Sequence, residues 1–363
     1  MTKKLFLNAV FIDDNRGLMM IVKIVKWFSL GAVGLFLLLV VVLLIGSKAS
    51  LDNNYSYTRQ VETLAVFSGQ AMDSATTGLV RIAANGYEFR ARIAGFESTP
   101  AAAEKPAVIL LHGFPVSSAM WVKLIKPLAE AGYRVVAFDQ RGYSPGARPP
   151  ELTDYTIDKL SSDVAAIADV LGLETFHLVG HDWGSAVGWN TVMQYPQRIE
   201  SWTALSIAHP TAFSEALEND PDQQSRSSYF ALFVMPWLPE VLFSFNDFQM
   251  LGGAYSEMLA EQKTEYIALF SEPGALTSAL NWYRAMTISQ QGAAQRPPEI
   301  STPTLFMWGD HDPTAGRLAV DMQQQYMTGP YRKVELDAGH WLMTDQPDAV
   351  VGEIIRHIET YSQ

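Results

Sequence analysis

The chain has 363 residues, 48% of them hydrophobic, with a formal net charge of −12 and no cysteine. This length and hydrophobic content are enough to bury a large core. The acidic balance excludes a basic face for binding nucleic acid, and the lack of cysteine excludes disulfides and thiolate metal sites.

Residues 27–45 carry no charge, and the stretch is close to the roughly 20 residues needed to cross a bilayer. It predicts a transmembrane helix, with a cytoplasmic segment at 1–26 and a juxtamembrane segment at 46–78. Five basic residues before the stretch favour a cytoplasmic N-terminus and an extracytoplasmic catalytic part of a single-pass membrane protein. The competing interpretation is a cleaved signal peptide, with translation starting at Met19 or Met20, which would give a secreted protein.

The rest of the chain has the pattern of one α/β domain. Two alternating runs from Leu79 flank Asn85 and Gly86, the dipeptide typical of a β-hairpin. Short apolar runs separated by amphipathic segments follow, as in a parallel sheet (AVILLHG, YRVVAFD, FHLVGHD and WTALSIAHP). Residues 211–298 are helical in pattern, before TLFMWGD and YRKVELDAGH add two strands. We therefore predict a mostly parallel α/β core at 79–210 and 299–363, with a helical lid at 211–298.

The first chemical motif is Gly-His-Asp-Trp-Gly at 180–184, between a predicted buried strand and a predicted helix. Small residues two positions before and after the centre are what a tight strand-to-helix turn requires, and such a turn raises its central side chain above the sheet. This makes Asp182 a candidate nucleophile. The competing interpretation is an aspartate that only caps the helix.

A second loop, His-Gly-Phe-Pro at 112–115, follows the first parallel strand. In the α/β-hydrolase arrangement this loop supplies a backbone N–H to the oxyanion site beside the nucleophile. We expect the backbone N–H groups of Phe114 and Trp183 to form that oxyanion hole.

Two further strand ends complete a triad in the chain order of α/β-hydrolases, with Asp312 as the acid and His340 as the base. Asp310 is the competing acid in the same turn. The remaining histidines are predicted to be structural or on the surface, because no metal-binding spacing is present: His112, His177, His181, His209, His311 and His357. Neither a metal nor a cofactor is expected.

A carboxylate nucleophile decides the type of reaction. Attack by Asp182 on an ester would form a high-energy anhydride, whereas attack on a saturated carbon forms an ordinary ester. Epoxides and alkyl halides are electrophiles of the second kind. Water would then split the alkyl-enzyme ester at its carbonyl, with the oxyanion held by two backbone donors.

These motifs, with DQRGYS at 139–144, resemble the epoxide hydrolase family of the α/β-hydrolase fold, over most of the chain from about residue 79. The most specific part of the resemblance is a pair of lid tyrosines, Tyr229 in YFALFVMP and Tyr283 in LNWYRAM. It implies that both phenols bind and protonate the epoxide oxygen, which suits a poor alkoxide leaving group. The implied fold is an α/β-hydrolase with an inserted lid, here preceded by the transmembrane helix.

Haloalkane dehalogenases share the elbow and are the nearest alternative. They typically have a halide-binding asparagine where this chain has Phe114, which disfavours them. A serine esterase is disfavoured because Ser185 lies three residues past the centre of the elbow. A ligand-binding protein that has lost catalysis is disfavoured because every expected catalytic residue is present.

The predicted lid is rich in aromatic residues: Phe213, Phe230, Phe233, Trp237, Phe243, Phe245, Phe248 and Trp282. An apolar pocket and a membrane anchor together suggest a small lipophilic epoxide as the substrate, with water as the second reactant. Tyr255 and Tyr266 are assigned to packing of the lid.

Overall fold

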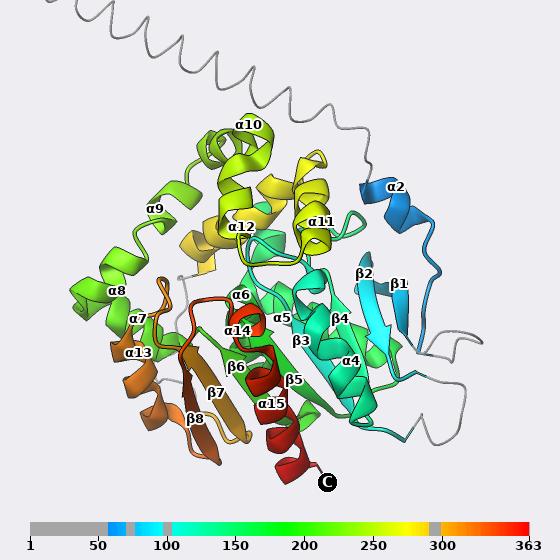
Figure 1. Cartoon of the computed structure of the whole chain (residues 1–363), viewed down its shortest axis with the longest axis vertical. Helices are drawn as coiled ribbons and strands as arrows, with labels where there is room; N and C mark the ends of the chain where they lie inside the picture. The colour runs from blue at the N-terminus through cyan, green and yellow to red at the C-terminus, as the bar shows by residue number, and fades with distance from the viewer. Residues whose placement is uncertain (1–56, 70–76, 97–103, 290–298, 363) are drawn as a thin grey trace, which may run out of the picture.

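The computed structural model describes residues 57–69, 77–96, 104–289 and 299–362. Within these residues eight strands form one sheet in the order β1-β2-β4-β3-β5-β6-β7-β8 (Figure 1). Strand β2 is antiparallel to β1 and β4, and the strands from β4 to β8 are parallel. The strands are β1 (Thr77–Ala84), β2 (Tyr87–Ala94), β3 (Ala107–Leu111), β4 (Arg134–Phe138), β5 (Phe176–His181), β6 (Ile199–Leu205), β7 (Thr304–Gly309) and β8 (Tyr331–Leu336).

The predicted hairpin is confirmed. Ala84 pairs with Tyr87 across a turn in which Asn85 and Gly86 have φ angles of 51° and 80°. A two-residue hairpin turn of this kind requires positive φ at both positions, and Asn-Gly adopts it at the lowest cost.

Both faces of the parallel sheet are covered by helices. Every residue of β3 and β5 is buried, because α4 and α15 pack on one face and α5 and α6 on the other (Figure 1). Continuous apolar strands are expected in such a sheet, so the predicted α/β core is confirmed. The core helices are η1 (Ser118–Trp121), α4 (Val122–Glu130), η2 (Leu152–Tyr155), α5 (Ile157–Val170), α6 (Trp183–Gln194), η3 (Pro196–Arg198), α13 (Arg317–Met322), η4 (Gln323–Tyr326), α14 (Leu342–Asp345) and α15 (Pro347–Tyr361).

The chain between β6 and β7 forms the lid. Figure 1 shows α10, α11 and α12 grouped at the top of the molecule, above the sheet. The lid helices are α7 (Pro210–Asn219), α8 (Pro221–Arg226), α9 (Phe230–Phe233), α10 (Leu238–Ala254), α11 (Ala260–Ser271) and α12 (Ala275–Ser289). Helix α10 is interrupted at residues 245–248, where the backbone leaves the helical region.

Helix α2 (Tyr57–Glu62) falls in the segment predicted to be juxtamembrane, yet it packs on the catalytic core. Tyr57 is fully buried, and its hydroxyl donates to Asp139 at 2.5 Å. The backbone N–H and the hydroxyl of Thr58 donate to Glu272 of the lid at 3.1 and 2.8 Å. Helix α2 is therefore part of the folded unit.

The fold prediction needs one correction. No helix in the described ranges is long and apolar enough to cross a membrane. The longest of them, α10, has 17 residues and is interrupted, whereas a span needs about 20. The predicted transmembrane helix at 27–45 lies outside the described residues, as does the cytoplasmic segment at 1–26. The membrane-spanning part of the fold prediction, and the single-pass localisation that depended on it, are therefore not supported.

Candidate active site

Asp182 stands at the turn between β5 and α6 with φ 54° and ψ −122°. The glycines of the motif make this turn possible. A Cβ on Gly180 would lie 2.3 Å from the carbonyl oxygen of Gly184, and one on Gly184 would lie 2.1 Å from that of Leu111. Only hydrogen fits at these positions. The turn places the Asp182 carboxyl in a buried site with 6% exposure.

Backbone N–H groups lie at the Asp182 carboxylate. The N–H of Phe114 donates to Oδ1 at 2.9 Å, and the N–H of Trp183 lies close enough to lower the pKa of the same carboxyl. Burial raises the pKa of Asp182, and His340 and the two N–H groups offset only part of that rise. The structure therefore brings both expected oxyanion donors to the carboxylate that would carry the oxyanion.

His340 lies between two carboxylates. Its Nδ1 is 3.0 Å from Oδ2 of Asp312, and its Nε2 is 3.6 Å from Oδ2 of Asp182. Burial alone would lower the pKa of His340, but Asp312 and then Asp182 outweigh it and raise the pKa to about 9. The pKa of Asp312 is lowered, because His340 and its hydrogen-bond donors outweigh burial. The imidazole is thus oriented by Asp312 and faces the nucleophile.

Two residues that the sequence did not suggest complete the surroundings of Asp312. Ser206 follows β6, has φ 73°, and donates its hydroxyl to Oδ2 of Asp312 at 2.5 Å. Thr314 donates its N–H at 2.7 Å and its hydroxyl at 2.8 Å to Oδ1. Ser206 was detectable in principle, because it ends a strand lying between those that carry Asp182 and Asp312. For Thr314 the sequence offers no signal other than its position two residues after Asp312.

His181 is fully buried beneath the base, and its Nε2 is 2.8 Å from the carbonyl oxygen of His340. The two rings lie 4.6 Å apart between centroids. Burial lowers the pKa of His181 well below its usual value, so the ring is neutral and its Nε2–H donates to that carbonyl. His181, which was predicted to be structural, thus directly supports the loop that carries His340.

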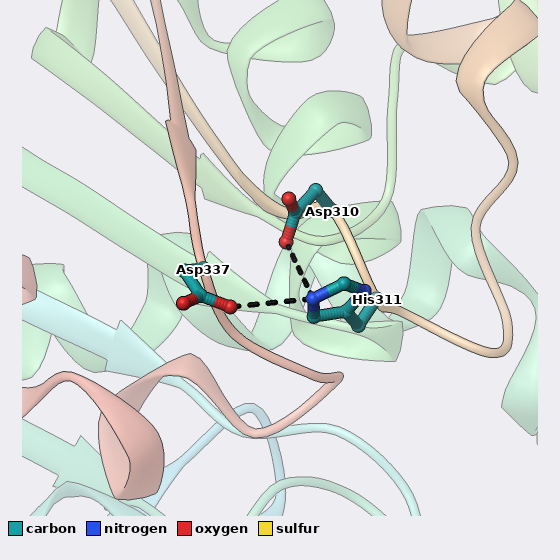
Figure 2. A group of neighbouring side chains, drawn as sticks. All are labelled: Asp310, His311 and Asp337. Atoms are coloured by element: carbon teal, nitrogen blue, oxygen red, sulfur yellow. Dashed lines mark ion pairs between the residues drawn. The ribbon is translucent and has the colours of Figure 1, made fainter.

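The competing acid, Asp310, points away from the triad. Figure 2 shows Asp310, His311 and Asp337 as one group, with Nε2 of His311 3.7 Å from Asp310 and 3.2 Å from Asp337. All three are exposed, and in the described part of the chain they form the one group with metal-ligand spacing, its atoms within 4.8 Å of one another. It lines neither cavity at Asp182.

The two lid tyrosines face the nucleophile from above. The ring centroids of Tyr229 and Tyr283 lie 6.2 Å apart, and both side chains line a cavity with Asp182. Burial first, and then neighbouring groups including Asp182, raise the pKa of both phenols well above 10. The ring of Trp183 packs edge-to-face with that of Tyr283, with 5.0 Å between the ring centroids. Both hydroxyls therefore keep their protons throughout the neutral range.

Two cavities meet at these residues. One, of about 220 Å³, is lined by Asp182, Tyr229 and mostly apolar side chains such as Phe213, Leu217 and Met286. The other, of about 360 Å³, shares Asp182 and Tyr229 and adds Phe114, Phe233, Phe243, Met250, Leu251, Tyr283 and His340. A hollow of about 690 Å³ elsewhere, near Glu200 and Tyr361, contains none of the predicted site residues.

Comparison with known proteins agrees with the fold described above. The family model of the alpha/beta hydrolase fold matches residues 106–347. The chain is 33% identical over 283 residues to epoxide hydrolase 4 from Homo sapiens, covering 75% of each protein. It is 32% identical over 295 residues to epoxide hydrolase A from Mycobacterium tuberculosis, covering 70% of this chain and 90% of the relative. The crystal structure of epoxide hydrolase A from Mycobacterium thermoresistibile is similar with a TM-score of 0.66 and 28% identity, covering 78% of this chain and 98% of that chain.

The fold and the triad geometry define the class of the protein as an α/β-hydrolase. Within that class the chain belongs to the epoxide hydrolase family, as the resemblance in the sequence implied.

Proposed function

We propose that the protein opens an epoxide to a vicinal diol through an ester on Asp182, in the reaction of the family to which it belongs. The observation that carries this proposal is the position of the carboxylate. Oδ1 of Asp182 accepts the N–H of Phe114, and Asp182 lines one cavity with Tyr229 and a second with both Tyr229 and Tyr283. This arrangement supplies a nucleophile for carbon and two acids for the oxygen that leaves it.

In the first step Oδ2 of Asp182 attacks an epoxide carbon. The ring C–O bond breaks as the ester bond forms, and a phenol gives its proton to the epoxide oxygen. An alkoxide is a strong base and a poor leaving group, so a phenol that donates its proton assists departure of the epoxide oxygen. The phenolate then regains a proton from solvent.

In the second step His340 takes a proton from water, which attacks the ester carbonyl of Asp182. The resting charges of Asp312 and Asp182 raise the pKa of His340 to about 9. Ester formation removes the charge of Asp182, so the pKa of His340 falls and its Nε2 becomes available as a base. The oxyanion forms on Oδ1, to which the N–H of Phe114 donates, with the N–H of Trp183 as the second expected donor. Collapse of this intermediate releases the diol, whose oxygen takes the proton from His340, and the carboxylic acid left on Asp182 then loses its proton to solvent.

We propose a lipophilic epoxide as the substrate. The side chains lining the two cavities are mostly apolar, and Asp182 and Tyr229 lie where the cavities meet. An epoxide with apolar substituents could place its ring there and bury them on either side. Faster turnover of small polar epoxides than of styrene oxide would contradict this choice.

The geometry favours epoxides over alkyl halides. The side chain of Phe114 packs against Phe233 and Tyr283, each at 5.5 Å between ring centroids, and offers no donor to a halide. Halide departure needs no phenol, so the two reactions respond differently to loss of the tyrosines.

The test uses the full-length protein with styrene oxide and with 1-bromobutane, measuring diol and bromide. We expect diol from the native protein and none from Asp182→Asn or from Tyr229→Phe/Tyr283→Phe. Bromide release that survives loss of both tyrosines, without diol from the native protein, would identify a dehalogenase instead. Lack of product from both substrates, together with binding of the epoxide, would favour a non-catalytic ligand-binding protein.

A further inference from the structure

Residues 112–119, the oxyanion loop, connect β3 to the first turn of η1 and carry the N–H of Phe114. The core holds the start of this loop. The N–H of Gln140 donates to Nε2 of His112 at 3.0 Å, and its side-chain amide donates to the His112 carbonyl at 2.6 Å. These two bonds fix the loop on the side of Phe114 nearest the sheet.

The lid holds the other side of the oxyanion loop. The hydroxyl of Tyr255 donates to the carbonyl oxygen of Pro115 at 2.5 Å, directly after Phe114. Farther along, two more lid residues bind the loop. Ser117 donates its hydroxyl to Glu265 at 2.7 Å, and Gln262 donates its amide to the Ala119 carbonyl at 2.8 Å. The position of Phe114 therefore depends on lid and core together.

The Glu265 carboxylate is held in place by balanced charges. It contacts Arg90 at 3.0 Å and Arg92 at 2.5 Å, and Arg90 also contacts the buried Asp139 at 3.0 Å. Asp139 in turn accepts the N–H of Ser118 at 2.8 Å. Two cations and two anions thus join α11 of the lid, β2 and the oxyanion loop into one rigid connection.

We propose that Tyr255 is a positioning residue, through which the lid sets the Phe114 N–H for the oxyanion formed when the alkyl-enzyme is hydrolysed. This inference rests on the proposed function. Tyr255 is fully buried and lines neither cavity at Asp182, so it acts through the loop and not on the substrate. Among the described residues, the one hydrogen-bond partner of its hydroxyl is the carbonyl oxygen of Pro115.

The two chemical steps need Phe114 to different degrees. In ester formation the negative charge leaves Asp182 and moves to the epoxide oxygen, which the phenols of the lid stabilise. In ester hydrolysis negative charge develops on Oδ1 of Asp182, next to the Phe114 N–H. Loss of an oxyanion donor costs about 100- to 1,000-fold in kcat. Displacement of that donor by a loosened loop should cost less, about tenfold, and should act on hydrolysis.

The lid offers a matched control in Tyr266. Its ring lies 5.0 Å from that of Tyr255, and both side chains are fully buried. The hydroxyl of Tyr266 has no hydrogen-bond partner among the described residues. Tyr255→Phe and Tyr266→Phe each remove one buried oxygen from the same part of the lid, but only the first frees the oxyanion loop.

The test follows both steps in the full-length protein with styrene oxide, by intact-protein mass spectrometry after rapid mixing and acid quenching. For Tyr255→Phe we expect ester formation within about twofold of the native rate, ester hydrolysis about tenfold slower, and an accumulating adduct. Tyr266→Phe should match the native protein in both steps. If Tyr255→Phe does not fold, Ser117→Ala removes another bond between the lid and the loop, the one to Glu265, and should slow hydrolysis about threefold.

Equal rates of ester hydrolysis in Tyr255→Phe and Tyr266→Phe would overturn the inference while leaving the proposed function intact. So would equal slowing of both steps in Tyr255→Phe, because that result indicates general loosening of the site. Absence of both adduct and diol in the native protein would overturn the proposed function and this inference together.

Discussion

Nε2 of His340 lies 3.6 Å from Oδ2 of Asp182, on the opposite side of the carboxylate from the oxygen that accepts the Phe114 N–H. Oδ2 is therefore the oxygen placed for attack, and Oδ1 is the one placed to become the oxyanion. His340 faces the ester after Asp182 has reacted. Substitutions at these two residues should consequently stop the reaction at different points.

Asp182→Asn should remove ester formation altogether, because a neutral amide is a poor nucleophile. We expect at least a 1,000-fold loss of kcat, on the order of what removal of a catalytic nucleophile costs. Diol formation and intact mass measure this loss. Asp310→Asn is the matched control, since Asp310 lies in the exposed group of Figure 2 and should retain activity within about twofold. Native rates in Asp182→Asn would refute the assignment.

His340→Gln should leave ester formation active and stop hydrolysis of the ester. The protein should take up one equivalent of epoxide and hold it, with steady-state turnover reduced by about 100- to 10,000-fold. Intact-protein mass after incubation with styrene oxide checks this outcome. A variant that forms no adduct while remaining folded would show that His340 acts before the ester forms.

Tyr229→Phe and Tyr283→Phe should each slow ester formation by about 10- to 100-fold, and the double variant by more than about 1,000-fold. The two phenols bind one oxygen, so either can partly replace the other. Stopped-flow quenching of tryptophan fluorescence, calibrated by mass, gives the rate of ester formation. Hydrolysis of ester already formed should keep its native rate, and a slowing of that step alone would contradict the proposed acid role.

Stability should depend on pH through His340. Its pKa is raised to about 9 in the folded protein, against about 6.5 when unfolded. Because the pKa is higher in the folded protein, protonated His340 stabilises the folded state. This stabilisation is complete below about pH 6.5 and is lost as the pH rises through about 9. Relative to His340→Gln, the native protein should lose up to about 3 kcal/mol of unfolding free energy between pH 6.5 and 10. Urea denaturation of both proteins at each pH measures the difference, and a parallel pH dependence would refute the shift.

Gly184→Ala should destabilise the protein by more than about 3 kcal/mol, because the added methyl group would lie 2.1 Å from the backbone oxygen of Leu111. Gly352→Ala provides the contrast. Gly352 lies inside α15, is exposed, and has nothing within 4 Å of the added carbon. That change should stabilise the protein by about 0.5–1 kcal/mol. Urea denaturation midpoints test the pair, and equal effects would contradict the account of the elbow.

The sequence predicted the fold best where the structural requirement is local. Asn85-Gly86 specifies a two-residue hairpin through φ alone, and the structure has that hairpin. The glycines around Asp182 specify a tight turn in the same way. The buried strands could be recognised because a parallel sheet covered on both faces needs continuous apolar runs. The hydrophobic stretch at 27–45 has an equally local pattern, but it lies outside the described residues.

The choice between Asp312 and Asp310 needed the tertiary structure. Both carboxylates occupy one turn, two residues apart, so their spacing in the sequence does not separate them. The fold turns Asp312 inward to His340 and leaves Asp310 with His311 at the surface. Ser206 and Tyr255 are further cases, since each acts on a residue more than 100 positions away in the chain.

The sequence by itself determined the α/β core, the strained turn at Asp182 and the order of the catalytic residues, because these follow from backbone conformation and hydrophobic periodicity within short segments. Only the tertiary structure decided which acid orients His340, which groups hold Asp312, and how the lid is bonded to the oxyanion loop. Those contacts join residues far apart in the chain, and side-chain directions across a packed interface are fixed by the packing of the whole domain.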